Sequence, residues 1–241
     1  MNSQETKKII TIHQPDFMPW LGLFYKINKS DLFVILDHVQ MDVKNSKWLK
    51  RVKMFVNNKS EWISIPLLKP KEGHMQAINE ILIDVNNKEF KKKKNQIINQ
   101  YSKHPFFNEV EPLIDVFFDT KVDSVQEKNI QFIKSVLLLL DIKTEIVISS
   151  ELEIQSSKNQ MNIDIIKLLK GDVYMSGMGA DGYQIECDFE KENIKLEYSN
   201  FNPLNYQYSQ KGGNEFVEGL SVLDAICNVG IDKLKEMLNE N

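Results

Sequence analysis

Apolar and polar positions alternate along this chain in the manner of an α/β protein, with short apolar runs separated by amphipathic stretches. Residues 8–12 form a β-branched apolar run, and residues 32–36 form a second one that lies between two aspartates. A continuous apolar run of this length is typical of a central strand that is buried on both faces. Residues 20–30 carry apolar side chains at helical spacing after two prolines. The first 40 residues therefore predict a right-handed strand–helix–strand unit.

Further strands are predicted where β-branched and apolar residues cluster between turn residues. They cover residues 62–67, 78–85, 145–150, 173–176 and 193–201. Stretches with helical spacing account for much of the remaining chain. They cover residues 90–101, 106–118, 124–140, 162–170 and 220–240. Ser124 and Glu127 form a capping box at the start of one helix, and Gly171 is a good residue to end another.

These elements predict the α/β class, with a mixed, partly parallel sheet and flanking helices. The three successive helices within residues 86–142 interrupt the strand pattern. We therefore expect residues 1–241 to form a single α/β domain in which residues 86–142 are a helical insertion or cap subdomain.

Composition narrows the possible functions. The 241 residues carry a net charge of −4, with 42% hydrophobic and 27% charged residues, so nucleic acid is disfavoured as the main partner. Two cysteines, Cys187 and Cys227, lack a CxxC spacing, and the chain opens without a secretory segment. We therefore expect reduced thiols and a cytoplasmic location. No apolar run is long enough for membrane insertion.

Polar residues follow three of the predicted strands, as His13-Gln14, Asp37-His38 and Ser176-Gly177. In open α/β sheets, ligands bind beyond the carboxyl ends of parallel strands, so we expect these ends to open into one polar cleft. A histidine there can act as a general base, and an adjacent aspartate can orient an imidazole or sugar hydroxyls. The structural alternatives are a satisfied cap for His13 and a loop cap for Asp37.

A basic stretch follows the second strand and contains Asn45, Lys47, Lys50, Arg51 and Lys53. It could clamp a diphosphate or a carboxylate, with Arg51 as the bidentate donor, or it could be a solvated face. Trp20, Trp48 and Tyr183 could form an apolar wall for a base or a sugar ring. Burial statistics favour the core for the two tryptophans.

Gly177, Gly179 and Gly182 have the spacing of a dinucleotide fingerprint. The sequence after them is too short and too charged for the long helix that this fingerprint requires. The glycines therefore indicate only a close approach of backbone to some ligand. The four histidines lack metal-ligand spacing, so no metal site is expected.

Several segments of this sequence resemble the WbqC-like family. They are "IHQPDFMPWLGLFYKI", "DLFVILDHVQM" and "NSKWLKRVKM" near the start, and "YMSGMGADGYQ" and "FVEGLSVLDAICNVG" in the second half. The resemblance implies a place in the biosynthesis of O-antigen lipopolysaccharide or other bacterial surface polysaccharides. It also implies an enzyme that acylates an amino sugar, for example with a glycyl group.

Matched residue by residue, the resemblance implies a site that contains His13, Gln14, Asp37, Gln40, Asn45, Trp48 and Arg51, with Ser176, Gly177 and Tyr183 opposite them. His38 stands where the family more often has a second aspartate. Ser221 and Asp224 match the last segment. Their spacing also fits the start of a helix, so we expect these two to be structural.

These observations favour a transferase that attaches an acyl or aminoacyl group to the amine of a nucleotide-linked amino sugar. His13 would be the base, Asp37 its orienting partner, and the backbone N–H groups of Gly177 and Gly179 the oxyanion donors, while Arg51 holds the diphosphate. Neither cysteine lies in a matched motif. The expected donor is therefore a carrier-protein thioester or an activated amino acid, which would make an acyl carrier protein a partner.

Two alternatives stay open. The opening unit also suits a nucleotidyltransferase of the HxGH type, although Trp20 and Leu23 occupy the positions of its two histidines, which removes the cations that this chemistry needs. A non-catalytic module that binds a sugar nucleotide or a carrier protein is the other alternative.

Overall fold

The computed structural model describes residues 7–40, 46–57, 59–69, 76–177, 184–211 and 215–240. The chain divides into two compact units. Unit 1 comprises Met1–Gln14, Tyr25–Asp37 and Lys143–Phe201, and unit 2 comprises Pro15–Phe24, His38–Ile142 and Asn202–Asn241. The α/β class predicted from the sequence is confirmed.

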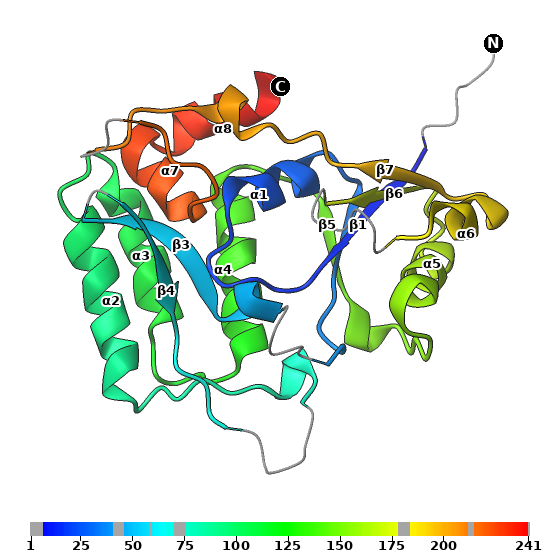
Figure 1. Cartoon of the computed structure of the whole chain (residues 1–241), viewed down its shortest axis with the longest axis horizontal. Coiled ribbons are helices and arrows are strands. Elements are labelled where there is room, and N and C mark those ends of the chain that lie inside the picture. Colours follow the sequence, from blue (N-terminus) through cyan, green and yellow to red (C-terminus); the bar gives the residue numbers. More distant parts are fainter. Residues whose placement is uncertain are drawn as a thin grey trace. The chain divides into compact units, whose positions relative to one another are not determined.

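Unit 1 is built on a five-stranded sheet in which every neighbouring pair is parallel (Figure 1). The strand order is β5-β2-β1-β6-β7. The strands are β1 (Ile9–His13), β2 (Leu32–Ile35), β5 (Glu145–Ile148), β6 (Val173–Ser176) and β7 (Lys195–Tyr198). All five lie within or overlap segments predicted to be strands. The central strands are the most apolar, because both faces of a parallel sheet are covered; all four residues of β2 are buried.

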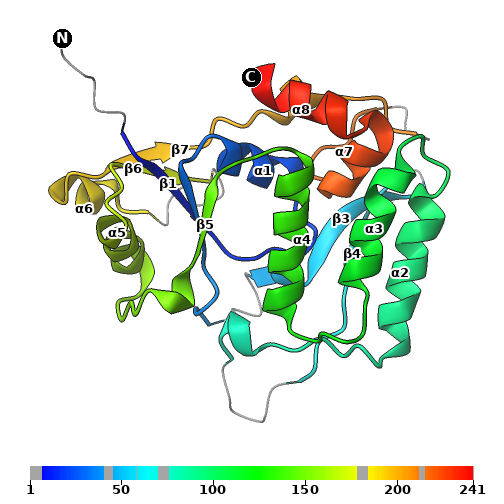
Figure 2. The ribbon, with the colours of Figure 1, turned by 180° about the vertical axis from the view of Figure 1, so that it is seen from behind.

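The crossover helices explain this strand order. Helix α1 (Leu21–Asn28) joins β1 to β2, α5 (Lys158–Leu168) joins β5 to β6, and α6 (Glu186–Lys191) joins β6 to β7 (Figure 2). Strands β2 and β5 lie on one side of β1, and β6 and β7 lie on the other side. The order is therefore that of a doubly wound sheet, and its topological switch point lies between β1 and β6.

Gly171 ends α5, but for a different reason from the one the sequence suggests. The residue with positive φ is Lys170, at 55°, and the N–H of Gly171 closes the helix by donating to the carbonyl of Ile166 at 2.9 Å. A Cβ on Gly171 would lie 2.5 Å from Cδ1 of Ile10 and 2.9 Å from Cγ2 of Ile166. Glycine is therefore needed because α5 must end directly against the central strand.

Unit 2 combines an antiparallel strand pair with a group of helices. The strands are β3 (Arg51–Val56) and β4 (Lys59–Ser64), preceded by the short 3-10 helix η1 (Ser46–Leu49). The helices are α2 (Lys88–Tyr101), α3 (Phe107–Phe117), α4 (Val125–Leu139), α7 (Val222–Val229) and α8 (Ile231–Glu240). Helices α2, α3 and α4 lie side by side (Figure 2).

Aromatic packing holds the helices of unit 2 together. Phe117 of α3 lies with its ring centroid 5.0 Å from Phe17 and 5.3 Å from Phe118, and Phe118 lies 4.8 Å from Phe90 of α2. Such aromatic pairs add to the stability that burial alone provides.

Helix α4 begins as predicted, because the hydroxyl of Ser124 accepts from the N–H three residues later at 3.2 Å.

One prediction of a strand in unit 2 is wrong, and one strand was missed. Residues 78–85 are not a strand: Ile78–Glu80 is the 3-10 helix η2, and Leu82 and Ile83 form only isolated bridges. Ile78, Ile81 and Ile83 are buried, so these apolar residues indicated burial but not a strand partner. Strand β3 was not predicted because its alternating Arg51 and Lys53 made the segment look like a basic loop.

Asp224, on α7, is fully buried and accepts hydrogen bonds from three side chains. The donors are Tyr101 at 3.0 Å, Tyr208 at 2.7 Å and Gln210 at 3.3 Å. Burial raises the pKa of this carboxyl to about 6, and the three hydrogen bonds act in the opposite direction. Ser221 caps α7, as predicted, by accepting from the N–H of Leu223 at 3.3 Å.

Each helix in the described ranges is too short or too polar to cross a lipid bilayer.

The close approach of α5 to β1 predicts that Gly171→Ala destabilises the protein. The added methyl group must push Ile10 or Ile166 aside, which should lower the free energy of unfolding by about 1–3 kcal/mol. Urea unfolding measures this. Gly177→Ala is the matched control, because a Cβ there meets no atom of the described residues within 4 Å. Equal losses in both variants would contradict the packing explanation.

The raised pKa of Asp224 predicts a specific pH dependence of stability. The folded carboxyl binds a proton more tightly than the unfolded one, whose pKa is near 3.8. Stability therefore falls as the pH rises from about 4 to about 6, by at most about 3 kcal/mol from this residue. Asp224→Asn should lack this component. Urea unfolding of both proteins at pH 4.5 and pH 7 tests this prediction. The free energy of unfolding of the unmodified protein minus that of Asp224→Asn should be smaller at pH 7 than at pH 4.5. An equal or larger value at pH 7 would contradict the prediction.

Candidate functional site

The carboxyl edge of the sheet in unit 1 gathers several of the residues predicted to form a site. His13 ends β1 and pairs in register with Ile35 of β2, so Asp37 follows two residues later at the same edge. Thr11 pairs with Met175 of β6, and continuing this register places His13 level with Gly177. His13, Asp37, Ser176 and Gly177 therefore share one edge. His13 and Gly177 lie at the switch point, where the connections from the two central strands diverge.

The side chain of His13 is held in one tautomer. Its Nδ1 lies 2.9 Å from the carbonyl oxygen of Gln14, to which it donates, so Nε2 is the acceptor nitrogen. Burial and the nearby ammonium of Lys26 lower the pKa of His13 to about 3, although the bond to Gln14 acts in the opposite direction. Lys26 is itself buried and lies 3.4 Å from the carbonyl of Ile12. The imidazole is therefore neutral at pH 7.

Asp37 connects the ends of β2 and β5. Its Oδ1 accepts from the hydroxyl of Ser149 and from the N–H of Ser150, both at 2.9 Å, and its Oδ2 accepts from the hydroxyl of Ser150 at 2.7 Å. Its own N–H donates to Ser149 at 3.1 Å. These bonds make Asp37 a positioning residue that joins the two strand ends. Sequence reasoning missed both serines, although they directly follow a predicted parallel strand.

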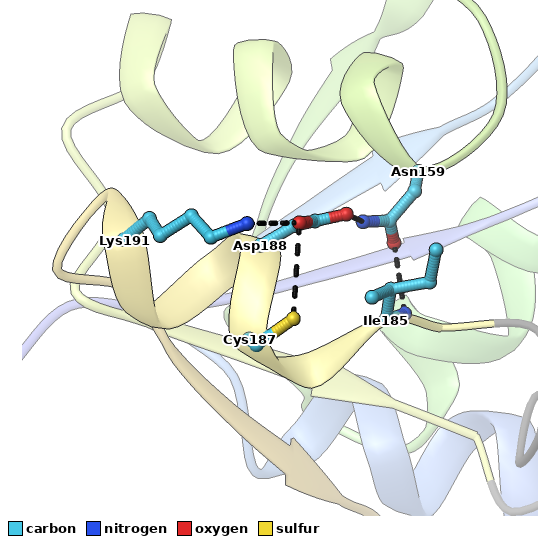
Figure 3. Close-up of polar contacts among 5 residues, drawn as sticks. All are labelled: Asn159, Ile185, Cys187, Asp188 and Lys191. Carbon is cyan, nitrogen blue, oxygen red and sulfur yellow. Dashed lines mark hydrogen bonds and ion pairs between the residues drawn. The ribbon is translucent and has the colours of Figure 1, made fainter.

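Strand β6 ends at Ser176, which is buried, and Gly177 follows it. Gly179 and Tyr183 were predicted to belong to the site but lie outside the described residues, as does Asn45. The chain is anchored again at α6 (Figure 3), where Asn159 donates to Asp188 at 3.2 Å and accepts from the N–H of Ile185 at 3.4 Å.

The cysteines show no feature of a nucleophile. Cys187 is exposed beside the anchor, and its Sγ lies 3.9 Å from the carboxylate of Asp188, which also pairs with Lys191 at 2.9 Å (Figure 3). Cys227 is fully buried, and burial raises the pKa of its thiol. In the described part of the chain, no three His, Cys, Asp or Glu side chains gather so as to hold a metal ion.

The other predicted residues lie in unit 2. His38 is half-buried, and Gln40 is exposed and forms an isolated bridge with Ala77. Trp20 is half-buried and bridges to Ser221. The expectation that Trp48 belongs to the core is wrong, because this residue is 40% exposed. It lies on η1, outside the buried face of the hairpin.

Trp48, Trp62, Arg51 and Lys53 form a surface that we name the tryptophan platform. The rings of Trp48 and Trp62 have centroids 5.0 Å apart and are tilted by 58°. The guanidinium of Arg51 lies 4.3 Å from the centroid of Trp62, and the ammonium of Lys53 lies 5.6 Å from it. Lys53 was predicted as part of the basic stretch that could bind a diphosphate, but Trp62 was not predicted to be in a site. The pairing of β3 with β4 brings Trp62 directly opposite Lys53.

A buried amide supports the loop beneath this platform. The side-chain N–H₂ of Asn129, on α4, donates to the carbonyls of Pro15 at 2.7 Å and of Leu49 at 2.9 Å. The carbonyl of Trp48 accepts from the N–H of Phe17 at 2.9 Å. Asn129 thus fixes the end of η1, which carries Trp48.

Comparison with known proteins adds one relative and one weak structural match. The uncharacterized protein Rv1507c of Mycobacterium tuberculosis is 25% identical over 227 residues, covering 93% of this chain and 95% of its own. A Zn(II)-bound mutant variant of AdcAII from Streptococcus pneumoniae aligns with 97% of this chain and 100% of its own, at 12% identity and a TM-score of 0.21. This score is too low to indicate a common fold.

A protein-family model matches a similar share of the sequence. The model of the WbqC-like protein family matches residues 14–236, which include Asp37, Ser176 and Gly177 of the sheet edge and all four residues of the tryptophan platform. The chain therefore belongs to the WbqC-like protein family.

Proposed function

We propose that this protein is a transferase that attaches an acyl or aminoacyl group to the amine of a nucleotide-linked amino sugar, in the biosynthesis of a bacterial surface polysaccharide. The observation that carries the proposal is the switch point of the doubly wound sheet. A neutral histidine there lies level with the glycine that follows the neighbouring strand, if the register of β1 and β6 is continued by two residues. This is where such sheets bind nucleotide ligands.

The reaction joins the amine nitrogen to the acyl carbon. The amine attacks the carbonyl of a thioester or an acyl adenylate, an amide bond forms, and the bond from the acyl carbon to sulfur or phosphate oxygen breaks. The proton lost by the nitrogen passes to Nε2 of His13, and from there to the leaving group or to solvent. Backbone N–H groups at and beyond Gly177 would stabilise the oxyanion of the tetrahedral intermediate.

The local structure suits His13 to this role in one respect. The bond from Nδ1 to the carbonyl of Gln14 leaves Nε2 as the proton acceptor, and a pKa of about 3 keeps the ring in its accepting form at pH 7. The contacts of Asp37 with Ser149 and Ser150 hold the neighbouring strand ends in place. Asp37 would then act by shaping the edge and not by taking a proton.

A binding module without catalytic activity is the second candidate. It is favoured by the same low pKa of His13, because a base this weak contributes less to proton transfer than one whose pKa is near 7. In this case the neutral imidazole would serve as a hydrogen-bond partner for a sugar nucleotide.

Replacement of His13 separates the two candidates. His13→Gln keeps an N–H donor but removes the titratable ring, so a transferase should lose about a hundredfold in kcat while the affinity for the nucleotide sugar changes little. The products of incubation with nucleotide-linked amino sugars and acyl donors are measured by mass spectrometry, and affinity by calorimetry.

Glu145→Gln is the matched control, because Glu145 is a titratable residue at the amino end of β5, at the other edge of the same sheet. It should leave kcat and affinity unchanged. If the unmodified protein binds the sugar nucleotide but makes no acylated product with any donor, the transferase proposal is wrong and the binding module is correct. Full activity of His13→Gln would exclude His13 as the base.

A further inference from the structure

The tryptophan platform is unusual for its exposed aromatic surface. Trp48 and Trp62 are each 40% exposed, although tryptophan is highly buried on average. Exposed aromatic rings that lie together mark binding surfaces more often than isolated exposed residues do. The platform therefore needs an explanation that packing within the fold does not supply.

The hairpin fixes which way the platform faces. Lys53 pairs directly with Trp62, and Arg51 pairs with Ser64, so these side chains share one face of the β3–β4 pair. Val52, Met54 and Ile63 lie on the other face and are buried at 1% exposure or less. Turning the platform inward would expose this apolar face, because a shift by one residue exchanges the two faces of a strand. The ring surfaces are thus preorganised toward solvent.

The platform carries two positive charges, on Arg51 and Lys53. Neither Arg51 nor Lys53 forms an ion pair with a carboxylate among residues 7–40, 46–57, 59–69, 76–177, 184–211 and 215–240, and Nε of Arg51 is buried there with no hydrogen-bond partner. Lys47 and Lys50 lie on either side of Trp48 and add to the positive charge. A guanidinium that stacks on an indole still directs its N–H donors outward in its own plane, where an anion can accept hydrogen bonds from them.

We propose that the tryptophan platform binds a nucleoside diphosphate, with the base stacked on Trp62 or Trp48 and the phosphates bound by Arg51 and Lys53. A flat ring suits the exposed indole faces, and the phosphates supply negative charge that can pair with the two cations. The inference rests on the proposed function for the diphosphate character of the ligand. It adds the contribution of Trp62 and the arrangement of both indole rings beside the two cations.

Binding is tested with the full chain and defined probes. Uridine diphosphate and adenosine diphosphate are titrated by calorimetry and by quenching of tryptophan fluorescence, beside uridine and inorganic pyrophosphate as the separate halves. We expect both nucleotides to bind at least about tenfold more tightly than either half, and more weakly as salt is raised. Equal or tighter binding of a single-stranded oligonucleotide per site would overturn the inference in favour of nucleic acid.

Variants locate the site. Trp62→Ala should weaken nucleotide binding at least about fivefold, the lower end of what one stacked base contributes. Arg51→Met keeps the aliphatic stem over the ring and should weaken it at least about tenfold through loss of the charged hydrogen bonds. Trp62→Phe, which keeps a stacking ring, should change it less than Trp62→Ala, so a folding defect of the alanine variant would not hide the result.

Lys59→Met is the matched control on the same hairpin. Lys59 lies an odd number of residues from Trp62, so its side chain is on the other face of the strand, and it pairs with Glu61 at 3.1 Å. It should leave binding unchanged. Nucleotide binding that survives both Trp62→Ala and Arg51→Met, or an absence of binding by the unmodified protein, would overturn the inference. Because these measurements need no acyl donor, the inference can hold even if no transfer reaction is found.

Discussion

The registered hydrogen bonding of the parallel sheet in unit 1 is the constraint on which the candidate site depends. Parallel strands bring their carboxyl ends to one edge, so the residue that ends each strand is placed without any side-chain contact being required. The pairing of His13 with Ile35, and of Ser176 with Tyr198, thereby sets which residues lie beside these polar strand ends. Asp37 reinforces the arrangement, since its carboxylate joins the ends of β2 and β5 through two serines.

Buried polar groups in the two units illustrate opposite uses of desolvation. In His13, burial favours the neutral ring and lowers its pKa to about 3, which keeps a proton acceptor at a strand end. In Asp224, burial favours the protonated carboxyl and raises its pKa to about 6, while two tyrosines and a glutamine satisfy its oxygens. Both side chains are also held in place by hydrogen bonds to fixed partners.

The sheet edge and the tryptophan platform have different physical origins. The sheet edge of unit 1 follows from backbone topology, and its polar groups come from residues adjacent to strand ends. The tryptophan platform of unit 2 follows from the alternation of side chains across a hairpin, with Val52 and Ile63 buried on one face and Lys53 and Trp62 on the other. The family model spans residues 14–236 and includes Asp37 and Gly177 of the sheet edge as well as the whole tryptophan platform.

The sequence by itself determined the parallel strands, the three helices within residues 86–142 and the strand ends where polar residues would gather. Each of these depends on local periodicity or on a residue that follows a strand, which a sequence displays directly. The tertiary structure alone decided that Ser149 and Ser150 bind Asp37, that Trp62 joins Trp48, and that residues 78–85 form no strand. It also showed that Gly171 is needed for space and not for its dihedral angles. These outcomes depend on which distant segments pack together, and no local pattern specifies that choice.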